Sequence, residues 1–121
     1  MELPQGDSDI VNWVKIPTVL SDEFYEVNVS CCYAFEYVEP YVYFHGGYDE
    51  NEIKGNFIAS VDLREEPLLT EIISLGADFP KGRSYHSLTA IGHKLYMFGG
   101  FDGVDVLDEF WEFDTITEVW S

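Results

Sequence analysis

The stretch Lys94-Leu95-Tyr96-Met97-Phe98-Gly99-Gly100-Phe101-Asp102 carries the pattern that decides the fold: a short apolar run, then a glycine pair, then an acidic turn. The stretch Tyr41-Val42-Tyr43-Phe44-His45-Gly46-Gly47-Tyr48-Asp49 repeats this pattern earlier in the chain. Short runs rich in aromatic and β-branched residues, bounded by Gly, Pro and Asp, are typical of β-strands. The sequence therefore predicts two equivalent strands, each followed by a loop that begins with a glycine pair.

These two stretches belong to a longer internal repeat. A shift of 53 residues, the distance from Gly46 to Gly99, pairs aromatic and acidic residues of the two copies: Tyr43 with Tyr96, Tyr48 with Phe101, and Asp49 with Asp102. With one residue of slippage, the strand-like run 57–62 falls on 109–114. A repeat of about 50 residues built from four short strands is the signature of a propeller blade. Only residues 66–75 could form a helix, and Pro67 disfavours one, so the chain is expected to be all-β.

The composition predicts one folded, soluble domain. The chain has 121 residues, of which 46% are hydrophobic and 17% aromatic, so it can bury a core and is not disordered throughout. No apolar run reaches the roughly 18 residues that a membrane span needs. The N-terminus has neither the basic start nor the apolar stretch of a secretory signal. We therefore expect a cytoplasmic or nuclear protein.

The charge restricts the choice of partner. Six Lys and Arg residues against 23 Asp and Glu residues give a formal net charge of −17. Nucleic acids and anionic membranes are bound through clustered cations, so neither is an expected partner. A basic protein surface would instead be attracted to this chain. The alternative is that the acidity only keeps an aromatic-rich protein soluble.

Residues 80–120 resemble a kelch repeat. They contain Pro80-x-x-Arg83-x-x-His86-Ser87, then Leu95-Tyr96-Met97-Phe98-Gly99-Gly100, then Asp108-x-x-Trp111-x-Phe113-Asp114, and finally Trp120. Residues 28–73 resemble a degenerate repeat without a closing Trp, and residues 13–17 resemble the last strand of a preceding blade. The implied organisation is an N-terminal segment (1–27), a degenerate kelch blade (28–79) and a kelch blade (80–121).

The resemblance implies kelch-type β-propeller blades: two four-stranded antiparallel blades plus one extra N-terminal strand. Because propellers close with roughly four to eight blades, this would be a partial propeller or one completed by oligomerisation. A glycine pair after a buried strand permits positive φ and close packing, and Tyr96 and Trp120 are expected to fill the space between adjacent sheets. The framework residues implied in this way are Gly46, Gly47, Gly99, Gly100, Tyr43, Tyr96, Trp111, Trp120 and Trp13.

The loops that follow the glycine pairs are expected to share one face of the blades with the loops between blades. Tyr48 and Phe101 are aromatic residues among acids on these loops, an arrangement that suits protein binding better than catalysis. The alternative is that the acids only satisfy turn geometry. Arg83 is expected to be a framework residue, yet its loop also makes it a candidate contact. The candidate partner-binding residues are Tyr48, Asp49, Glu50, Glu52, Phe101, Asp102, Asp105 and Arg83.

The sequence gives little support for an enzyme. It contains no nucleophile elbow, metalloprotease motif or phosphate-binding loop. His45, His86 and His93 do not recur at metal-ligand spacings, and the acidic run 49–55 has Ile53 where a calcium loop needs an oxygen ligand. The ligand sets of copper- or iron-dependent kelch enzymes cannot be placed on this chain. We therefore expect no catalytic residues, no metal and no cofactor.

Two functions from different classes follow. The first is a non-enzymatic kelch module whose acidic loop face and open strand edges bind another protein, with a basic surface favoured. The second is a self-assembling propeller building block, because exposed strand edges invite pairing with another chain. A fragment of a kelch-type enzyme is a further alternative with less support.

Overall fold

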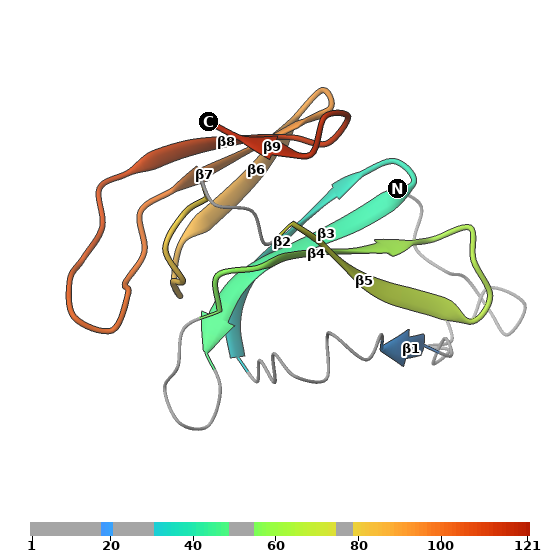
Figure 1. Ribbon diagram of the computed structural model, residues 1–121, viewed down its shortest axis with the longest axis horizontal. Coiled ribbons are helices and arrows are strands. Elements are labelled where there is room, and N and C mark those ends of the chain that lie inside the picture. The colour runs from blue at the N-terminus through green and yellow to red at the C-terminus, as the bar shows by residue number, and fades with distance from the viewer. Residues whose placement is uncertain (1–17, 21–30, 49–54, 75–78) are drawn as a thin grey trace, which may run out of the picture.

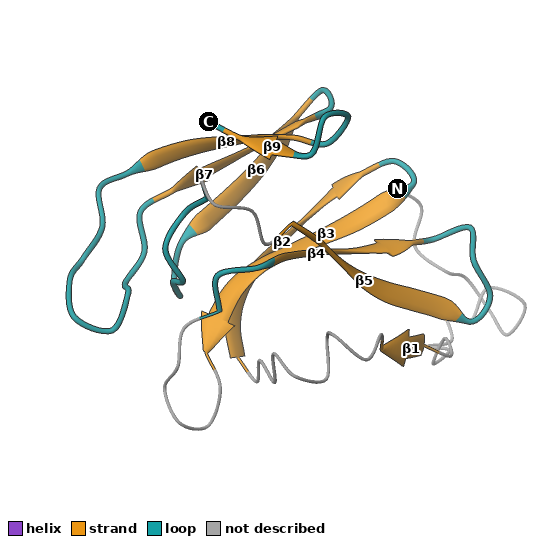
Figure 2. Cartoon of the chain, viewed as in Figure 1, coloured by secondary structure: helices purple, strands orange, loops and turns teal. Residues whose placement is uncertain are grey.

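The computed structural model describes residues 18–20, 31–48, 55–74 and 79–121, and these residues form strands and loops (Figure 1). The strands are β1 (Thr18–Leu20), β2 (Cys31–Val38), β3 (Tyr41–Tyr48), β4 (Ile58–Asp62), β5 (Leu68–Ser74), β6 (Ser87–Ile91), β7 (Lys94–Phe98), β8 (Phe110–Asp114) and β9 (Val119–Trp120). Figure 2 shows no helix in these ranges, so no described segment is a helix that could cross a membrane. The predicted all-β class is confirmed.

The strands form two sheets. In the first, with order β1-β5-β4-β3-β2, strands β2 to β5 are antiparallel and β1 pairs with β5 in parallel. The second has the order β6-β7-β8-β9 and is antiparallel throughout. The two predicted four-stranded antiparallel units are therefore present, and they do not close into a ring within the described residues. The strand predicted at residues 13–17 lies outside these residues, whereas β1 covers the edge of β5 that was expected to be open.

The strand register reproduces the sequence repeat. Tyr43 on β3 lies opposite Ser60 on β4, and Tyr96 on β7 lies opposite Glu112 on β8. The offset is 53 residues for the first strand of each pair and 52 for the second, as the sequence predicts. The two sheets are therefore copies of one structural unit.

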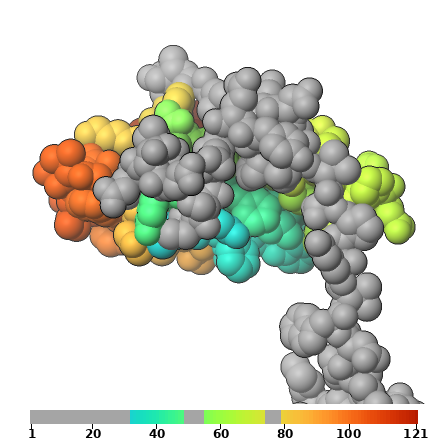
Figure 3. Space-filling model, turned by 90° about the horizontal axis from the view of Figure 1, so that it is seen from below, coloured from blue at the N-terminus to red at the C-terminus, as the bar shows by residue number. Residues whose placement is uncertain are grey.

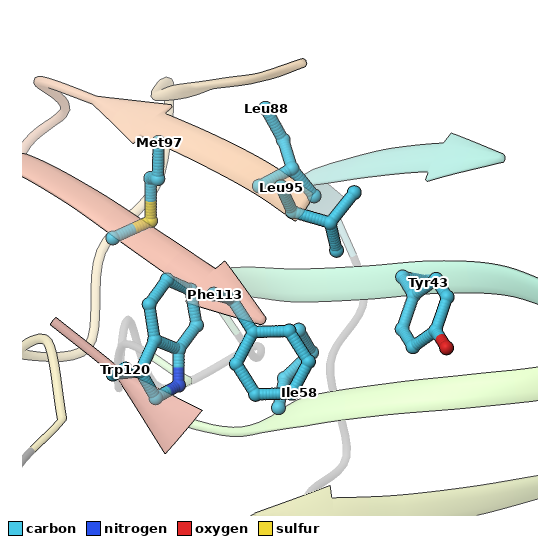
Figure 4. Packing of buried hydrophobic residues seen from close by; sticks show 7 residues of the cluster. All are labelled: Tyr43, Ile58, Leu88, Leu95, Met97, Phe113 and Trp120. Atoms are coloured by element: carbon cyan, nitrogen blue, oxygen red, sulfur yellow. The ribbon is translucent and has the colours of Figure 1, made fainter. Parts of the chain in front are cut away.

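The core lies between the two sheets, which stack face to face (Figure 1). Figure 4 shows Tyr43 and Ile58 of the first sheet opposite an apolar group of the second sheet: Leu88, Leu95, Met97, Phe113 and Trp120. Trp120 is buried, and its ring centroid lies 5.0 Å from that of Phe113. Removing these apolar side chains from water is the main force that holds the sheets together.

Each sheet also presents aromatic residues on the face turned away from this core. Tyr33, Phe35 and Tyr37 alternate along β2 and are exposed, and Phe98 and Phe110 are exposed on the second sheet. Tyr96 belongs to this outward face and stacks on Phe110, with ring centroids 5.8 Å apart. Tyr96 is the counterpart of Tyr43, so it faces the position that a next blade would occupy, and its expected place between the sheets of adjacent blades stays a prediction.

Candidate functional site

A buried arginine joins the loops of the second sheet. The Arg83 side chain is fully buried, and its guanidinium donates hydrogen bonds to the carbonyl oxygens of Lys81 (3.1 Å) and Gly99 (3.0 Å) and to the Glu109 carboxylate (2.6 Å). This cation lowers the pKa of Glu109, which also accepts a hydrogen bond from the Trp111 indole at 3.0 Å. The prediction that Arg83 contacts a partner is therefore wrong. Its side chain is buried and bound to three acceptors within the chain, so it is a framework residue.

The backbone of the same residue binds the first sheet. The Arg83 carbonyl accepts a hydrogen bond from the Gly47 amide at 2.7 Å, and the Arg83 amide donates to the Gly55 carbonyl at 3.2 Å. Gly46 and Gly47 have φ angles of 74° and 88°, and Gly99 and Gly100 have 71° and 105°. These positive values are strained for residues with a Cβ, so the glycine pairs let the chain turn where the sheets meet.

Two histidines form a second buried link between the sheets. His45 Nδ1 on β3 lies 3.1 Å from His86 Nε2, just before β6. The remaining ring nitrogens, His45 Nε2 and His86 Nδ1, are buried without a partner among the described residues. Burial holds the pKa of His45 well below its usual value, with His86 and Arg83 acting in the same direction. Burial, helped by Arg83, lowers the pKa of His86 to about 4, so both rings are neutral at pH 7.

Three aromatic residues lie at the end of the sheets where the glycine pairs are, and two of them, Tyr48 and Tyr85, are in contact. The Tyr48 and Tyr85 rings lie 6.2 Å apart, and their hydroxyl oxygens are separated by 3.4 Å. Phe101 exchanges two backbone hydrogen bonds with Ser84, at 2.9 and 3.0 Å, so it flanks the same short segment. The structure thus brings together Tyr48 and Phe101, the two predicted aromatic anchors, around the segment 84–85.

Tyr85 also belongs to this surface, although the sequence did not predict it as a partner-binding residue. Its side chain is 66% exposed, and its φ of 59° is unusual for a residue with a bulky side chain. Such a conformation persists only where the surroundings hold it, and here the Tyr85 amide donates to the Cys32 carbonyl at 3.3 Å. No local sequence pattern predicts that Tyr85 is exposed, since Arg83 and Ser84, which precede it, are both buried.

The acids of the loop after β7 have different roles. The Asp102 carboxylate accepts hydrogen bonds from the Val104 amide (2.9 Å) and the Asp105 amide (2.7 Å), and these bonds lower its pKa. Asp102 therefore shapes the turn, as the alternative interpretation expected, while Asp105 is exposed to solvent. Asp49, Glu50, Glu52 and Trp13 lie outside the described residues. We call the described surface formed by Tyr48, Tyr85, Phe101, Asp102 and Asp105 the loop face.

Within residues 18–20, 31–48, 55–74 and 79–121, no three His, Cys, Asp or Glu side chains are grouped so that they could hold a metal ion. His45 and His86 face each other between the sheets, with 3.1 Å between His45 Nδ1 and His86 Nε2. The loop face itself offers aromatic rings, hydroxyls and carboxylates, which suit contact with another protein.

Together, the two repeated antiparallel sheets and the glycine-pair loops define a β-propeller repeat module. Residues 82–121 match the family model of the kelch motif, so the second sheet, with the loop that precedes it, carries a kelch motif. The first sheet has the same strand order and is consistent with a second kelch blade. Modules of this class often mediate protein binding. No curated protein matches the chain.

Proposed function

We propose that this chain is a non-enzymatic interaction module of the cytoplasm or nucleus, and that its loop face binds the basic surface of a partner protein. The observation that carries the proposal is the aromatic group of Tyr48, Tyr85 and Phe101. The Tyr48 and Tyr85 rings are in contact, Phe101 pairs through its backbone with the neighbouring Ser84, and Tyr85 is largely exposed. Aromatic anchors surrounded by polar and charged groups are the usual centres of protein interfaces.

The charge supports a basic partner. The net charge of the chain is −17, and Asp105 stands exposed beside the aromatic cluster. Lys81 is the exposed cation nearest in sequence to this cluster, and its ammonium already lies 3.7 Å from the Asp102 carboxylate. Asp49, Glu50 and Glu52 follow soon after Tyr48 in the sequence and add three acidic residues next to it along the chain. Long-range attraction of a basic surface should therefore raise the association rate at low ionic strength.

The first prediction tests the loop face with a matched pair of variants. Tyr85→Ser/Asp105→Asn removes one exposed aromatic ring and one charge from the loop face, and Ile91→Ser/Glu39→Gln removes one apolar side chain and one charge from turns at the other end of the sheets. Tyr85 and Ile91 are equally exposed, at 66%. The amount of bound partner protein, measured by quantitative mass spectrometry on the immobilised chain, should fall roughly thirtyfold with the first variant only, since a hot-spot aromatic contributes about 2 kcal/mol. Equal retention by all three chains would refute the proposal.

A second candidate function, self-assembly, is favoured by the two outward faces. Because Tyr96 is equivalent to Tyr43 in the repeat, the outward face of the second sheet corresponds to the core-facing side of the first sheet. In the same way, the outward face of the first sheet corresponds to the core-facing side of the second sheet. A second copy could therefore stack head to tail on the first in the way that the two sheets stack within one chain. Heterologous contacts of this kind close into rings when the rotation allows it.

The second prediction tests this assembly by the mass of the species in solution. If the copies stack, light scattering at micromolar concentration should give about two to four protomers, enough for a propeller of roughly four to eight blades. Phe110→Asp, which places a charge on the outward face of the second sheet, should return the chain to a monomer with unchanged circular dichroism. A wild-type chain that remains monomeric up to the highest soluble concentration would contradict self-assembly and leave the loop-face proposal intact.

A further inference from the structure

An acidic groove lies at the end of the sheets opposite the loop face. It consists of two adjoining hollows of about 390 and 350 Å³, which share Tyr41, Ser60 and Glu71. The first hollow extends along the β4–β5 turn to Glu65 and Glu66, and the second runs between the two sheets to Glu118. We define the acidic groove by these residues: Tyr41, Ser60, Glu65, Glu66, Glu71 and Glu118. Figure 1 shows the β4–β5 turn and the loop after β7 at opposite ends, and the same two segments, yellow-green and orange, are far apart in Figure 3.

The carboxylates of this groove are not neutralised from within the described chain. Glu65, Glu66, Glu71 and Glu118 are all exposed, and none forms an ion pair with a described residue. Arg64, the cation that precedes Glu65, is already bound to Asp62 with an N–O distance of 2.7 Å. Glu65, Glu66 and Glu71 line the first hollow, and Glu71 and Glu118 line the second. Carboxylates grouped in this way repel one another, and a cation placed among them would relieve that repulsion.

A largely buried serine at the centre of the groove is a second and independent indication of a ligand. Ser60 is only 8% exposed, and it lines both hollows. Its hydroxyl makes no hydrogen bond to another described residue, although it can both donate and accept. The hydroxyl oxygen is not sealed off from the hollow, so it is available as an acceptor for a ligand N–H. Figure 4 shows the Tyr43 hydroxyl, which lines the same groove, pointing away from the apolar cluster.

The wall of the groove already binds one cation. The Arg64 guanidinium carbon lies 5.7 Å from the centre of the Tyr41 ring, and Arg64 donates a hydrogen bond to the Tyr41 hydroxyl at 3.2 Å. A cation over an aromatic face is attracted by the ring quadrupole. The Tyr43 ring stands 6.0 Å from the Tyr41 ring, so the aromatic wall continues into the second hollow, where carboxylates but no described cation are present.

From these features we propose that the acidic groove binds a lysine or arginine side chain of a basic peptide segment in a partner protein. The cation lies among Glu66, Glu71 and Glu118, its N–H groups reach the Ser60 hydroxyl, and its aliphatic stem packs on the tyrosine wall. Arginine fits best, because its planar guanidinium can stack on a ring and bind carboxylates at once. The groove is a separate site from the loop face, so either site can exist without the other.

The test uses a fluorescein-labelled peptide of alternating Arg and Gly as the probe, and a Gln-Gly peptide of the same length as its control. Glu66→Gln/Glu71→Gln removes two charges from the acidic groove, and Glu39→Gln/Asp108→Asn removes two exposed charges that belong neither to the groove nor to the loop face. Fluorescence anisotropy should show the Arg-Gly peptide binding the groove variant roughly fivefold more weakly than the wild-type chain, since each exposed ion pair contributes modestly. The Glu39/Asp108 variant should bind within about a factor of two of the wild type.

The position of the peptide gives the second readout. Amide NMR shifts should change around Ser60, Glu71 and Glu118 on addition of the Arg-Gly peptide and stay constant for the Gln-Gly peptide. Equal weakening by both double variants would mean attraction to the overall charge and would overturn the groove. Shift changes confined to residues 101–108 would also overturn it, while supporting the loop face as the basic-peptide site. Absence of binding at low ionic strength would overturn it as well.

Discussion

Replacing Gly46 with alanine is expected to lower the free energy of unfolding by about 3 kcal/mol or more. The φ of Gly46 is +74°, a conformation that costs a residue with a Cβ roughly 1–2 kcal/mol. A Cβ built there would stand 2.3 Å from the Arg83 carbonyl oxygen and 2.6 Å from His86 Cε1. The first of these atoms belongs to the backbone and cannot turn aside, so the two sheets must move apart, and overpacking of this kind costs about 1–3 kcal/mol more.

Substitutions at two other glycines measure the cost of a positive φ without a close steric contact. Gly92 has a φ of +62° with no atom within 4 Å of an added Cβ, and Gly99 has a φ of +71° with only the Leu107 carbonyl oxygen at 3.5 Å. Gly92→Ala and Gly99→Ala should therefore each cost only about 1–2 kcal/mol. Urea unfolding followed by circular dichroism measures all three variants. A Gly46→Ala variant as stable as Gly92→Ala would show that the sheets do not approach each other at this point.

The strands and their register could be predicted because the signals for them are local. Residues 94–98 and 110–114 are bounded by turn residues, and the structure places β7 and β8 at these limits. The repeat then predicted which strands pair, since Tyr43 and Tyr96 occupy equivalent positions in the two sheets. The exposed aromatic face of β2 had a usable signal as well, in the alternation of Tyr33, Phe35 and Tyr37.

The parts that could not be predicted depend on contacts between distant residues. The kelch resemblance implied a framework role for Arg83, but the sequence did not show its partners, the Gly99 carbonyl and the Glu109 carboxylate. The exposure of Tyr85 had no sequence signal. The acidic groove joins Ser60 on β4 to Glu118 in the β8–β9 turn, and nothing in either local sequence indicates that these residues line one hollow. Sequence periodicity identifies faces of strands, but it does not say which faces meet.

The His45–His86 pair should make the chain sensitive to acid between about pH 6.5 and pH 4. In the unfolded chain both histidines take up protons near their ordinary pKa of about 6.5. In the folded chain the pKa of His86 is about 4 and that of His45 is also strongly lowered, so both rings stay neutral. The unfolded state therefore binds more protons in this range, and the free energy of unfolding contributed by the pair falls as the pH falls. For His86 alone the difference amounts to at most about 3 kcal/mol.

Other groups also titrate in acid, so the effect is best measured as a difference between variants. Protonation of the carboxylates reduces the repulsion within a chain of net charge −17, which stabilises the folded state and partly masks the histidines. Carboxylates whose pKa is lowered, such as Glu109, lose their contribution only near and below pH 4.5. His86→Gln can still hydrogen-bond to His45, and it should flatten the dependence of unfolding free energy on pH above pH 4.5. Identical pH profiles for the wild type and His86→Gln would mean that His86 takes up its proton without disturbing the packing of the two sheets.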